Sequence, residues 1–325
     1  MNVVIFALEH IPIGDWVEDT LVPWLNDNFG WLFDWIKERA TSLNDQLTTL
    51  LSWPTPLIFA IILAFIAWRV RGWMMAVFTF FGLLLIDNLG YWDHAMMTLA
   101  LVLISALVAV AIGVPTGIIG ARSKTFSAIV RPQLDFMQTM PAFVYLIPAV
   151  TFFRIGVVPG MVATVIFSMP PAVRLTELGI RQVDEEVVEA GQAFGASPSR
   201  ILFKIQLPLA RPTIMAGVNQ VIMLALSMVV IAGMIGAPGL GSDVYGAVTR
   251  VRIGTGFEAG LCVVIIAVIL DRLTSAFGSD AQSTKPSLFA RVRGMLSKET
   301  AEPTDANANA NGQSATNSTN QTAGV

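Results

Sequence analysis

The stretch that decides the fold reads EAGQAFG at residues 189–195 and continues, nine residues later, with IQLP at residues 205–208. It is a polar interruption between strongly hydrophobic segments. Fixed residue types at fixed gaps make this a specific motif, because each added position lowers the chance of a random match. The motif positions are Glu189, Ala190, Gly191, Gly195, Ile205, Leu207 and Pro208.

The local sequence predicts two short helices that meet at a corner. Acidic residues at 184–186 complement the dipole of a helix that begins there, and Gly195 permits the left-handed turn that ends it. Ser197 followed by Pro198 is typical of the start of a second helix, expected over residues 199–206 and stopped at Pro208. On these signals alone, an amphipathic surface loop without a partner is the simpler interpretation.

The composition indicates an all-α, polytopic helical membrane protein. Hydrophobic residues make up 54% of the 325-residue chain and charged residues only 13%, whereas soluble domains carry about 25% charge. Much of the surface is therefore expected to face lipid. The net charge of −3 gives no indication of nucleic-acid binding, and Cys262, the single cysteine, excludes a disulfide framework. The sequence predicts no catalytic, cofactor or metal site.

Hydropathy predicts about seven transmembrane helices, since about 20 residues at 1.5 Å each cross the hydrocarbon core. The fourth span contains Pro141 and Pro148, and the fifth ends with Pro170 and Pro171. Such breaks are tolerated in lipid where neighbouring helices satisfy the freed carbonyl groups, so both spans are expected to face protein. The spans are expected at residues 55–70, 73–90, 95–120, 133–153, 157–176, 213–236 and 257–277.

The distribution of lysine and arginine predicts the orientation. Four segments on one side, residues 69–72, 121–132, 174–212 and those after 270, hold 15 of the 20 basic residues. Positive residues accumulate in the cytoplasm, so the N-terminus is expected outside and the C-terminus inside. The five basic residues on the other side are Lys37, Arg39, Arg154, Arg250 and Arg252.

Together with four further strings, the motif resembles the permease subunit of ATP-binding-cassette importers for glycine betaine and proline betaine. The docking loop of that family reads Glu-Ala-Ala, three residues, Gly, nine residues, Ile-x-Leu-Pro, and only Gly191 departs from it, in place of alanine. The resemblance covers residues 55–278 and implies a type I importer permease fold. The strings are MQTMPAFVYL at 137–146, PTIMAGVNQ at 212–220, LALSMVVIA at 224–232 and ILDRLT at 269–274.

The resemblance implies a transport subunit rather than an enzyme, in the bacterial cytoplasmic membrane. Two ATPase subunits would dock on the 184–208 loops, an external binding protein would deliver the osmolyte, and a second permease copy would complete the pore. The chain has no Gly-x-x-x-x-Gly-Lys-[Ser/Thr] loop, so ATP and Mg²⁺ are expected in the partner ATPase. Substrate selectivity is expected mainly in the binding protein, where aromatic faces can attract a quaternary ammonium.

The chain is expected to divide into three parts. Residues 1–53, rich in tryptophan, predict an extracytoplasmic amphipathic helix at the membrane interface, with a contact surface for the binding protein as the alternative. Residues 54–278 form the transmembrane permease domain, with the cytoplasmic coupling loop at 177–211. Residues 279–325 are rich in Ser, Thr, Asn, Ala and Gln, which predicts a disordered cytoplasmic tail.

Polar residues within the spans are candidates for a substrate path, because they would be costly facing lipid. Hydrogen bonding between helices is the more frequent role of such residues. The glycine-rich segment 236–256 is a candidate external gate, and equally an ordinary connector. The path candidates are Gln138, Thr139, Ser168, Asn219, Gln220 and Ser227.

Two other classes of function compete with ATP-driven import. A secondary transporter or channel for a small zwitterion would carry ionisable residues at mid-membrane for ion coupling, yet Asp87, Asp93 and Asp271 lie at span ends. A membrane enzyme would need a nucleophile–base pair or a metal-ligand cluster, and the sequence suggests neither.

Overall fold

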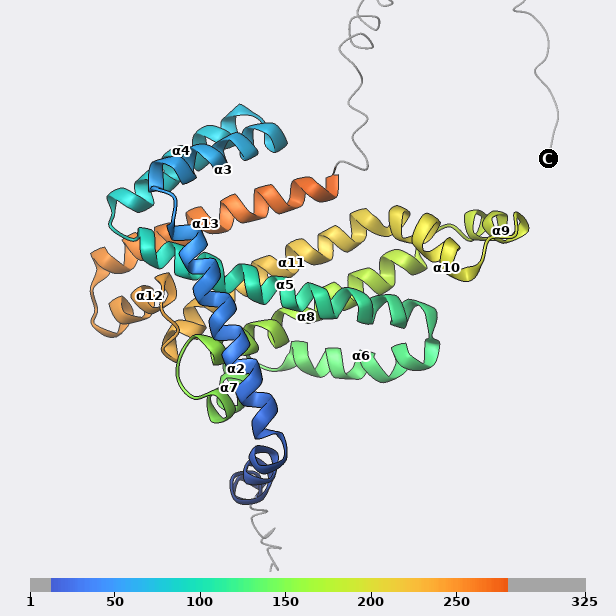
Figure 1. Cartoon of the computed structure of the whole chain (residues 1–325), viewed down its shortest axis with the longest axis horizontal. Coiled ribbons are helices and arrows are strands. Elements are labelled where there is room, and N and C mark those ends of the chain that lie inside the picture. The colour runs from blue at the N-terminus through green and yellow to red at the C-terminus, as the bar shows by residue number, and fades with distance from the viewer. Residues whose placement is uncertain (1–12, 280–325) are drawn as a thin grey trace, which may run out of the picture. The chain divides into compact units, whose positions relative to one another are not determined.

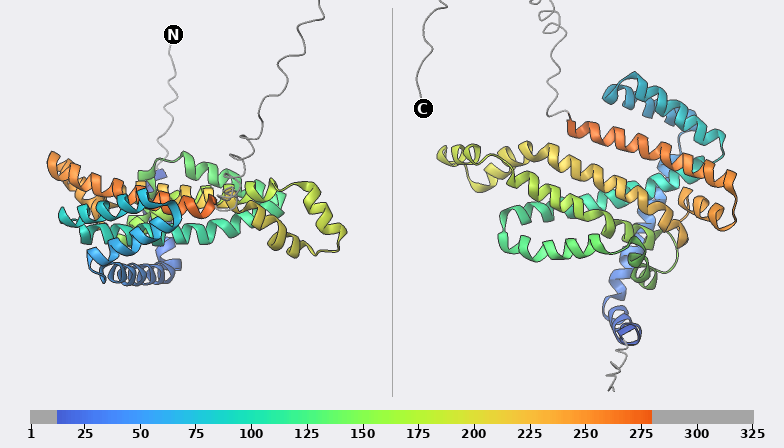
Figure 2. Two further views of the ribbon diagram at one scale, coloured as in Figure 1. Left: turned by 90° about the horizontal axis from the view of Figure 1, so that it is seen from above. Right: turned by 180° about the vertical axis from the view of Figure 1, so that it is seen from behind.

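The computed structural model describes residues 13–279, and every regular element in that part of the chain is helical. The disordered tail predicted for residues 279–325 lies, apart from Ser279, outside the described residues. The first elements are α1 (Ile13–Trp16), a π turn (Val17–Leu21) and α2 (Val22–Ser52), which runs crosswise to the other long helices (Figures 1 and 2). Residues 13–52 of the predicted N-terminal segment are therefore helical. Their extracytoplasmic position stays a prediction.

The two faces of α2 meet different surroundings. Trp24, Trp31 and Trp35 are exposed, as interfacial anchors are. On the opposite face, Ala40 and Leu47 pack against the main hydrophobic core. The second half of α2 is thus part of the helical body.

Three long helices form the centre of the fold: α5 (Trp92–Arg122), α8 (Val157–Arg181) and α11 (Leu207–Met234). α8 packs extensively against both of the others. A Cβ at Gly117 of α5 would lie 2.5 Å from the carbonyl oxygen of Val173 in α8. The absence of a side chain at this position lets the two backbones touch, as small residues do between membrane helices.

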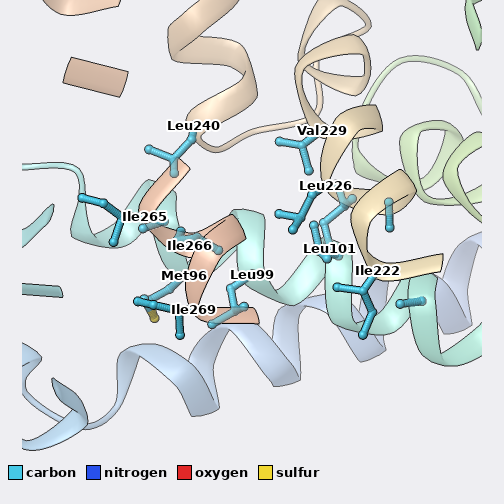
Figure 3. Packing of buried hydrophobic residues seen from close by; sticks show 14 of the residues in the cluster. Met96, Leu99, Leu101, Ile222, Leu226, Val229, Leu240, Ile265, Ile266 and Ile269 are labelled. Atoms are coloured by element: carbon cyan, nitrogen blue, oxygen red, sulfur yellow. The ribbon is translucent and has the colours of Figure 1, made fainter. Parts of the chain in front are cut away.

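The main core lies where α5, α11 and α13 (Ile253–Ser279) converge, next to the short helix α12 (Leu240–Thr249). Figure 3 shows aliphatic side chains from all four helices meeting there. Helices that are apolar on most sides are typical of buried or membrane-embedded elements. The labelled residues are Met96, Leu99, Leu101, Ile222, Leu226, Val229, Leu240, Ile265, Ile266 and Ile269.

The first two predicted spans form a short hairpin, α3 (Pro56–Arg71) and α4 (Trp73–Asn88), that turns at Gly72. Pro56 occupies the first turn of α3, as expected. Each helix has 16 residues, or about 24 Å at 1.5 Å per residue, which is less than the hydrocarbon thickness of about 30 Å.

The fourth predicted span, residues 133–153, is wrong as one continuous helix. The chain forms α6 (Lys124–Thr139), a 3₁₀ turn (Ala142–Tyr145) and α7 (Leu146–Phe153), and the direction changes by 108° at the break. The cause is Pro141, because a proline disfavours helical geometry in the residue before it. Met140 is accordingly extended, with ψ of 133°.

The fifth predicted span does not end at Pro170 and Pro171, because α8 continues to Arg181. Both prolines are buried, and a Cβ at Gly217 of α11 would lie 3.2 Å from the Pro171 carbonyl oxygen. This close packing agrees with the expectation that the span faces protein.

The structure has four helices long and apolar enough to cross a membrane, or up to six if each bent pair is one span, where the sequence predicted about seven. Three predicted spans are not among the four long helices, because the chain breaks at Pro141 and because α3 and α4 have only 16 residues each. The four helices are Trp92–Arg122, Val157–Arg181, Pro198–Met234 and Ile253–Ala276.

Basic segments that the sequence assigned to one side meet in space. Arg71, at the tip of the α3–α4 hairpin, donates from Nε to the Arg272 carbonyl oxygen (3.1 Å) and from a guanidinium nitrogen to Ser275 Oγ (2.6 Å). Arg181 donates in the same way to the Gly120 carbonyl oxygen (2.9 Å). The first two contacts join the α3–α4 turn to the segment after residue 270, and the third joins the end of α8 to the end of α5. Which side of the membrane they face stays a prediction.

Candidate functional site

The motif of residues 189–208 forms a helical corner at one end of the central helices (Figure 1). We call residues 184–208 the α9–α10 corner. Its first helix, α9 (Glu185–Ala193), is capped by Asp184, whose side chain accepts a hydrogen bond from the Glu186 N–H (3.2 Å). Acidic residues in the first turn match the prediction.

The turn between the two helices is closed by backbone hydrogen bonds. The Ala196 N–H donates to the Gly191 carbonyl oxygen (3.1 Å) and the Gly195 N–H to that of Gln192 (2.8 Å). This pair of bonds defines a Schellman motif, whose penultimate residue is left-handed. Gly195 has φ of +75°, which confirms the predicted turn.

The second helix begins where predicted but does not stop at Pro208. α10 (Pro198–Ile201) follows Ser197, whose side chain makes no capping hydrogen bond. A π turn (Leu202–Gln206) then leads directly into α11, so the helix is continuous from Pro198 to Met234. A proline ring collides with the carbonyl four residues earlier. Here that carbonyl belongs to Lys204, inside the wider π turn, which gives the ring room.

The corner is held together by contact between its two legs. A Cβ at Gly191 would lie 2.8 Å from Ile205 Cδ1 and 3.6 Å from Ile201 Cγ1. The Ile205 side chain therefore occupies the space beside Gly191, the residue that departs from the family pattern. Leu202 is buried with Ile180 of α8 and Ala210 of α11, and Leu207 packs on the same cluster. The corner is thus anchored to both central helices.

The outer surface of the corner is available to a partner. Glu189, Ala190 and Pro208 are exposed, and Phe194 at the tip is 91% exposed. The ring is therefore free to contact a partner at the tip of the corner. Phe194 is not among the predicted site residues, although its position directly before the turn glycine could have suggested a role.

The path candidates separate into two kinds. Ser168 is buried, and its hydroxyl donates to the Thr164 carbonyl oxygen of its own helix (2.7 Å). Asn219 Nδ2 donates to Asp271 Oδ1 (2.9 Å), and Asn219 Oδ1 accepts from Thr274 Oγ1 (2.6 Å), which ties α11 to α13. Both side chains join or support helices, the role that is common for polar groups in spans.

The other four candidates are exposed: Gln138 and Thr139 at the end of α6, and Gln220 and Ser227 on α11. Ser227 lines an open groove of about 390 Å³ between α11 and α13. The groove is largely apolar, with the carboxylate of Asp271 and the guanidinium of Arg272 at one end. Gln138 and Thr139 lie on another element and do not line it.

The candidate gate forms α12, which is fastened to the beginning of α5. The Leu240 N–H donates to Thr98 Oγ1 (2.9 Å), and His94 Nδ1 lies 2.5 Å from Asp243 Oδ2. Between residues 13 and 279, no three His, Cys, Asp or Glu side chains gather as a metal site would require.

Comparison with known proteins gives a family match. The sequence profile of the binding-protein-dependent transport system inner membrane component matches residues 113–281. The glycine betaine transport system permease protein OpuAB of Bacillus subtilis is 52% identical over 267 residues, covering 82% of this chain and 94% of that protein. The glycine betaine/carnitine transport permease protein GbuB of Listeria monocytogenes is 53% identical over 277 residues, covering 84% and 98%.

A third relative and a solved structure agree. The glycine betaine/proline betaine transport system permease protein ProW of Escherichia coli is 49% identical over 274 residues, covering 84% of this chain and 77% of that protein. A chain of the inward-facing MetNI methionine ABC transporter superposes with a TM-score of 0.54 at 20% identity, covering 59% of this chain and 96% of that chain. This likeness concerns the fold alone.

Proposed function

Because the chain belongs to the family of inner membrane components of binding-protein-dependent transport systems, we propose that it is the membrane subunit of an ATP-driven importer. Its substrate is glycine betaine, proline betaine or a related quaternary-ammonium osmolyte, the class for which its relatives are named. The observation that carries the proposal is the α9–α10 corner, a braced pair of helices with an exposed tip.

The corner is suited to mechanical coupling. ATP can change the conformation of this chain only if the ATPase contacts its two states differently. The exposed surface around Glu189 and Phe194 supplies the contact, and the bracing of Gly191 against Ile205 lets the corner move as a unit. Two ATPase subunits that bind ATP and Mg²⁺, an external binding protein and a second copy of this chain complete the transporter.

The remaining site assignments follow from this role. The residues that dock the ATPase or shape its docking surface are those of the motif, Glu189, Ala190, Gly191, Gly195, Ile205, Leu207 and Pro208. The exposed polar residues of α11, Gln220 and Ser227, are the path residues that best suit a pore between two copies. The N-terminus lies outside and the corner lies in the cytoplasm.

The test is uptake of radiolabelled glycine betaine by proteoliposomes that contain the complete transporter. We expect uptake to require internal ATP, and Glu189→Lys or Phe194→Ser to abolish uptake and substrate-stimulated ATP hydrolysis while the binding protein keeps its affinity. Phe257→Ser makes the same change at a phenylalanine that is 71% exposed near the start of α13 and should leave ATPase binding intact. Uptake driven by an ion gradient without ATP would instead establish a secondary transporter.

A further inference from the structure

A buried carboxylate joins three helices beside the α9–α10 corner. Glu177 of α8 is 5% exposed. Its Oε1 accepts hydrogen bonds from Ser127 Oγ (2.7 Å) and from a guanidinium nitrogen of Arg131 (2.8 Å), both on α6, and lies 3.0 Å from a guanidinium nitrogen of Arg181 on α8. Arg181 also binds the carbonyl oxygen of Gly120 at the end of α5. We call these four side chains the Glu177 cluster.

The cluster supplies much of the attachment of α6. Among the residues of α6, only Ser127 and Leu134 are buried. α5, α8 and α11, in contrast, meet through close backbone packing, as at Gly113, Gly117 and Gly217. The Glu177 side chain is 7% exposed, whereas that of Arg131 is 59% exposed. Loss of the Arg131 partner is therefore costly on the Glu177 side, because the carboxylate stays desolvated. The cluster is therefore a contact between α6 and α8 that is centred on a buried carboxylate.

The position of the cluster links the corner to α6. Arg181 is the last residue of α8, and Asp184, the cap of α9, follows three residues later. From its other end α6 leads into the break at Pro141, after which Tyr145 packs against Phe167 of α8. A displacement of the corner acts directly on the end of α8 and reaches α6 through Glu177.

We propose that the Glu177 cluster is a clamp that makes α6 move with α8 when the ATPase displaces the corner, so that Glu177 is a positioning residue for transport. The inference rests on the proposed function. The clamp transmits ATPase closure to α6 and the broken segment after it. Without the clamp, ATP hydrolysis continues but α6 no longer follows, and transport becomes uncoupled from hydrolysis.

The main test removes the α6 half of the clamp with Ser127→Ala and Arg131→Gln together, which leaves Arg181 to pair with Glu177. In proteoliposomes containing the complete transporter, betaine uptake per ATP hydrolysed should fall about tenfold while ATP hydrolysis and ATPase co-purification stay within about twofold. Glu177→Gln should act in the same direction. If the double variant does not insert into the membrane, the single variant Arg131→Gln is used in its place. This variant keeps Ser127 and Arg181 as donors to Glu177.

A matched control uses the neighbouring surface pair. Arg174 of α8 and Asp135 of α6 also form an ion pair, but the Asp135 side chain is 64% exposed, whereas that of Glu177 is 7% exposed, and exposed pairs contribute little. Arg174→Gln should therefore leave uptake per ATP unchanged within about twofold.

A rescue experiment separates transmission from general damage. Asp135→Cys and Arg174→Cys are added to the clamp variant in a Cys262→Ala background, and a short thiol cross-linker then joins α6 to α8. Cross-linking should restore at least half of the parental uptake per ATP.

Parental uptake per ATP in the clamp variants would overturn the inference. So would a parallel loss of hydrolysis and uptake, or a completed cross-link that leaves uptake at the variant level. Absence of ATP-dependent uptake by the parent would overturn the proposed function and the inference together.

Discussion

Replacing Gly195 with valine would place a β-branched side chain on a left-handed backbone. The φ of +75° is fixed by the two hydrogen bonds that close the turn. No heavy atom lies within 4 Å of the position that a Cβ would take, so the cost of the substitution comes from the backbone alone. A left-handed L-residue costs about 1–2 kcal/mol. This corresponds to a roughly 5- to 30-fold loss of the native corner relative to opened forms.

We expect Gly195→Val to insert normally but to lose ATPase co-purification and betaine uptake by a similar factor. Gly195→Asn is the matched control, because asparagine tolerates the left-handed region and should stay close to the parent. Amide hydrogen exchange of residues 185–196 reports the opening of the corner directly. Full co-purification and uptake with Gly195→Val, alongside faster exchange, would refute the view that docking needs a closed corner.

Three further predictions concern packing and orientation. Gly191→Ala should stabilise α9 by about 0.5–1 kcal/mol through the higher helix propensity of alanine, but overlap of the new Cβ with Ile205 Cδ1 should offset this gain. In an Ile205→Val background, which lacks that Cδ1 atom, the gain should appear. A double-mutant cycle on the hydrogen-exchange protection of α9 measures both effects. Asn219→Ala should lower the free energy of unfolding in detergent by about 0.6–2 kcal/mol, since it removes the bonds to Asp271 and Thr274, whereas Gln220→Ala, at an exposed side chain, should not. In a Cys262→Ala background, cysteines introduced at Asp45 and Val251 should react with an impermeant thiol reagent added outside intact cells, and a cysteine at Ser199 should not. Labelling at Ser199 would show the opposite orientation and would contradict docking of the ATPase on the corner.

Much of the corner could be predicted from sequence because its signals are local. Gly195 and Asp184 each act on residues within one turn, through backbone geometry and capping. Four of the predicted spans match long helices for a related reason, since hydropathy is read within each span. The failure at Pro208 shows the limit, because a π turn that depends on the following helix accommodates the proline.

The prolines show why the number of spans could not be predicted. The sequence marks positions 141, 170 and 171 equally as possible breaks. Pro170 and Pro171 are buried inside α8, which passes through them, and the Pro171 carbonyl lies close to Gly217 of α11. Pro141 is exposed, and the chain turns there by 108°. Whether a proline breaks a helix therefore depends on neighbours far away in sequence.

The Glu177 cluster is non-local in the same sense, and this determines what it can do. Arg131 and Ser127 lie 46 and 50 residues from Glu177 in the chain, so no window of sequence contains the contact. Arg181, four residues from Glu177, marks only the half that lies on α8. Local signals build the corner proposed to dock the ATPase, and long-range contacts connect it to the rest of the protein. An importer needs both, because a corner that docks correctly but is not joined to the spans would let ATP be hydrolysed without moving substrate.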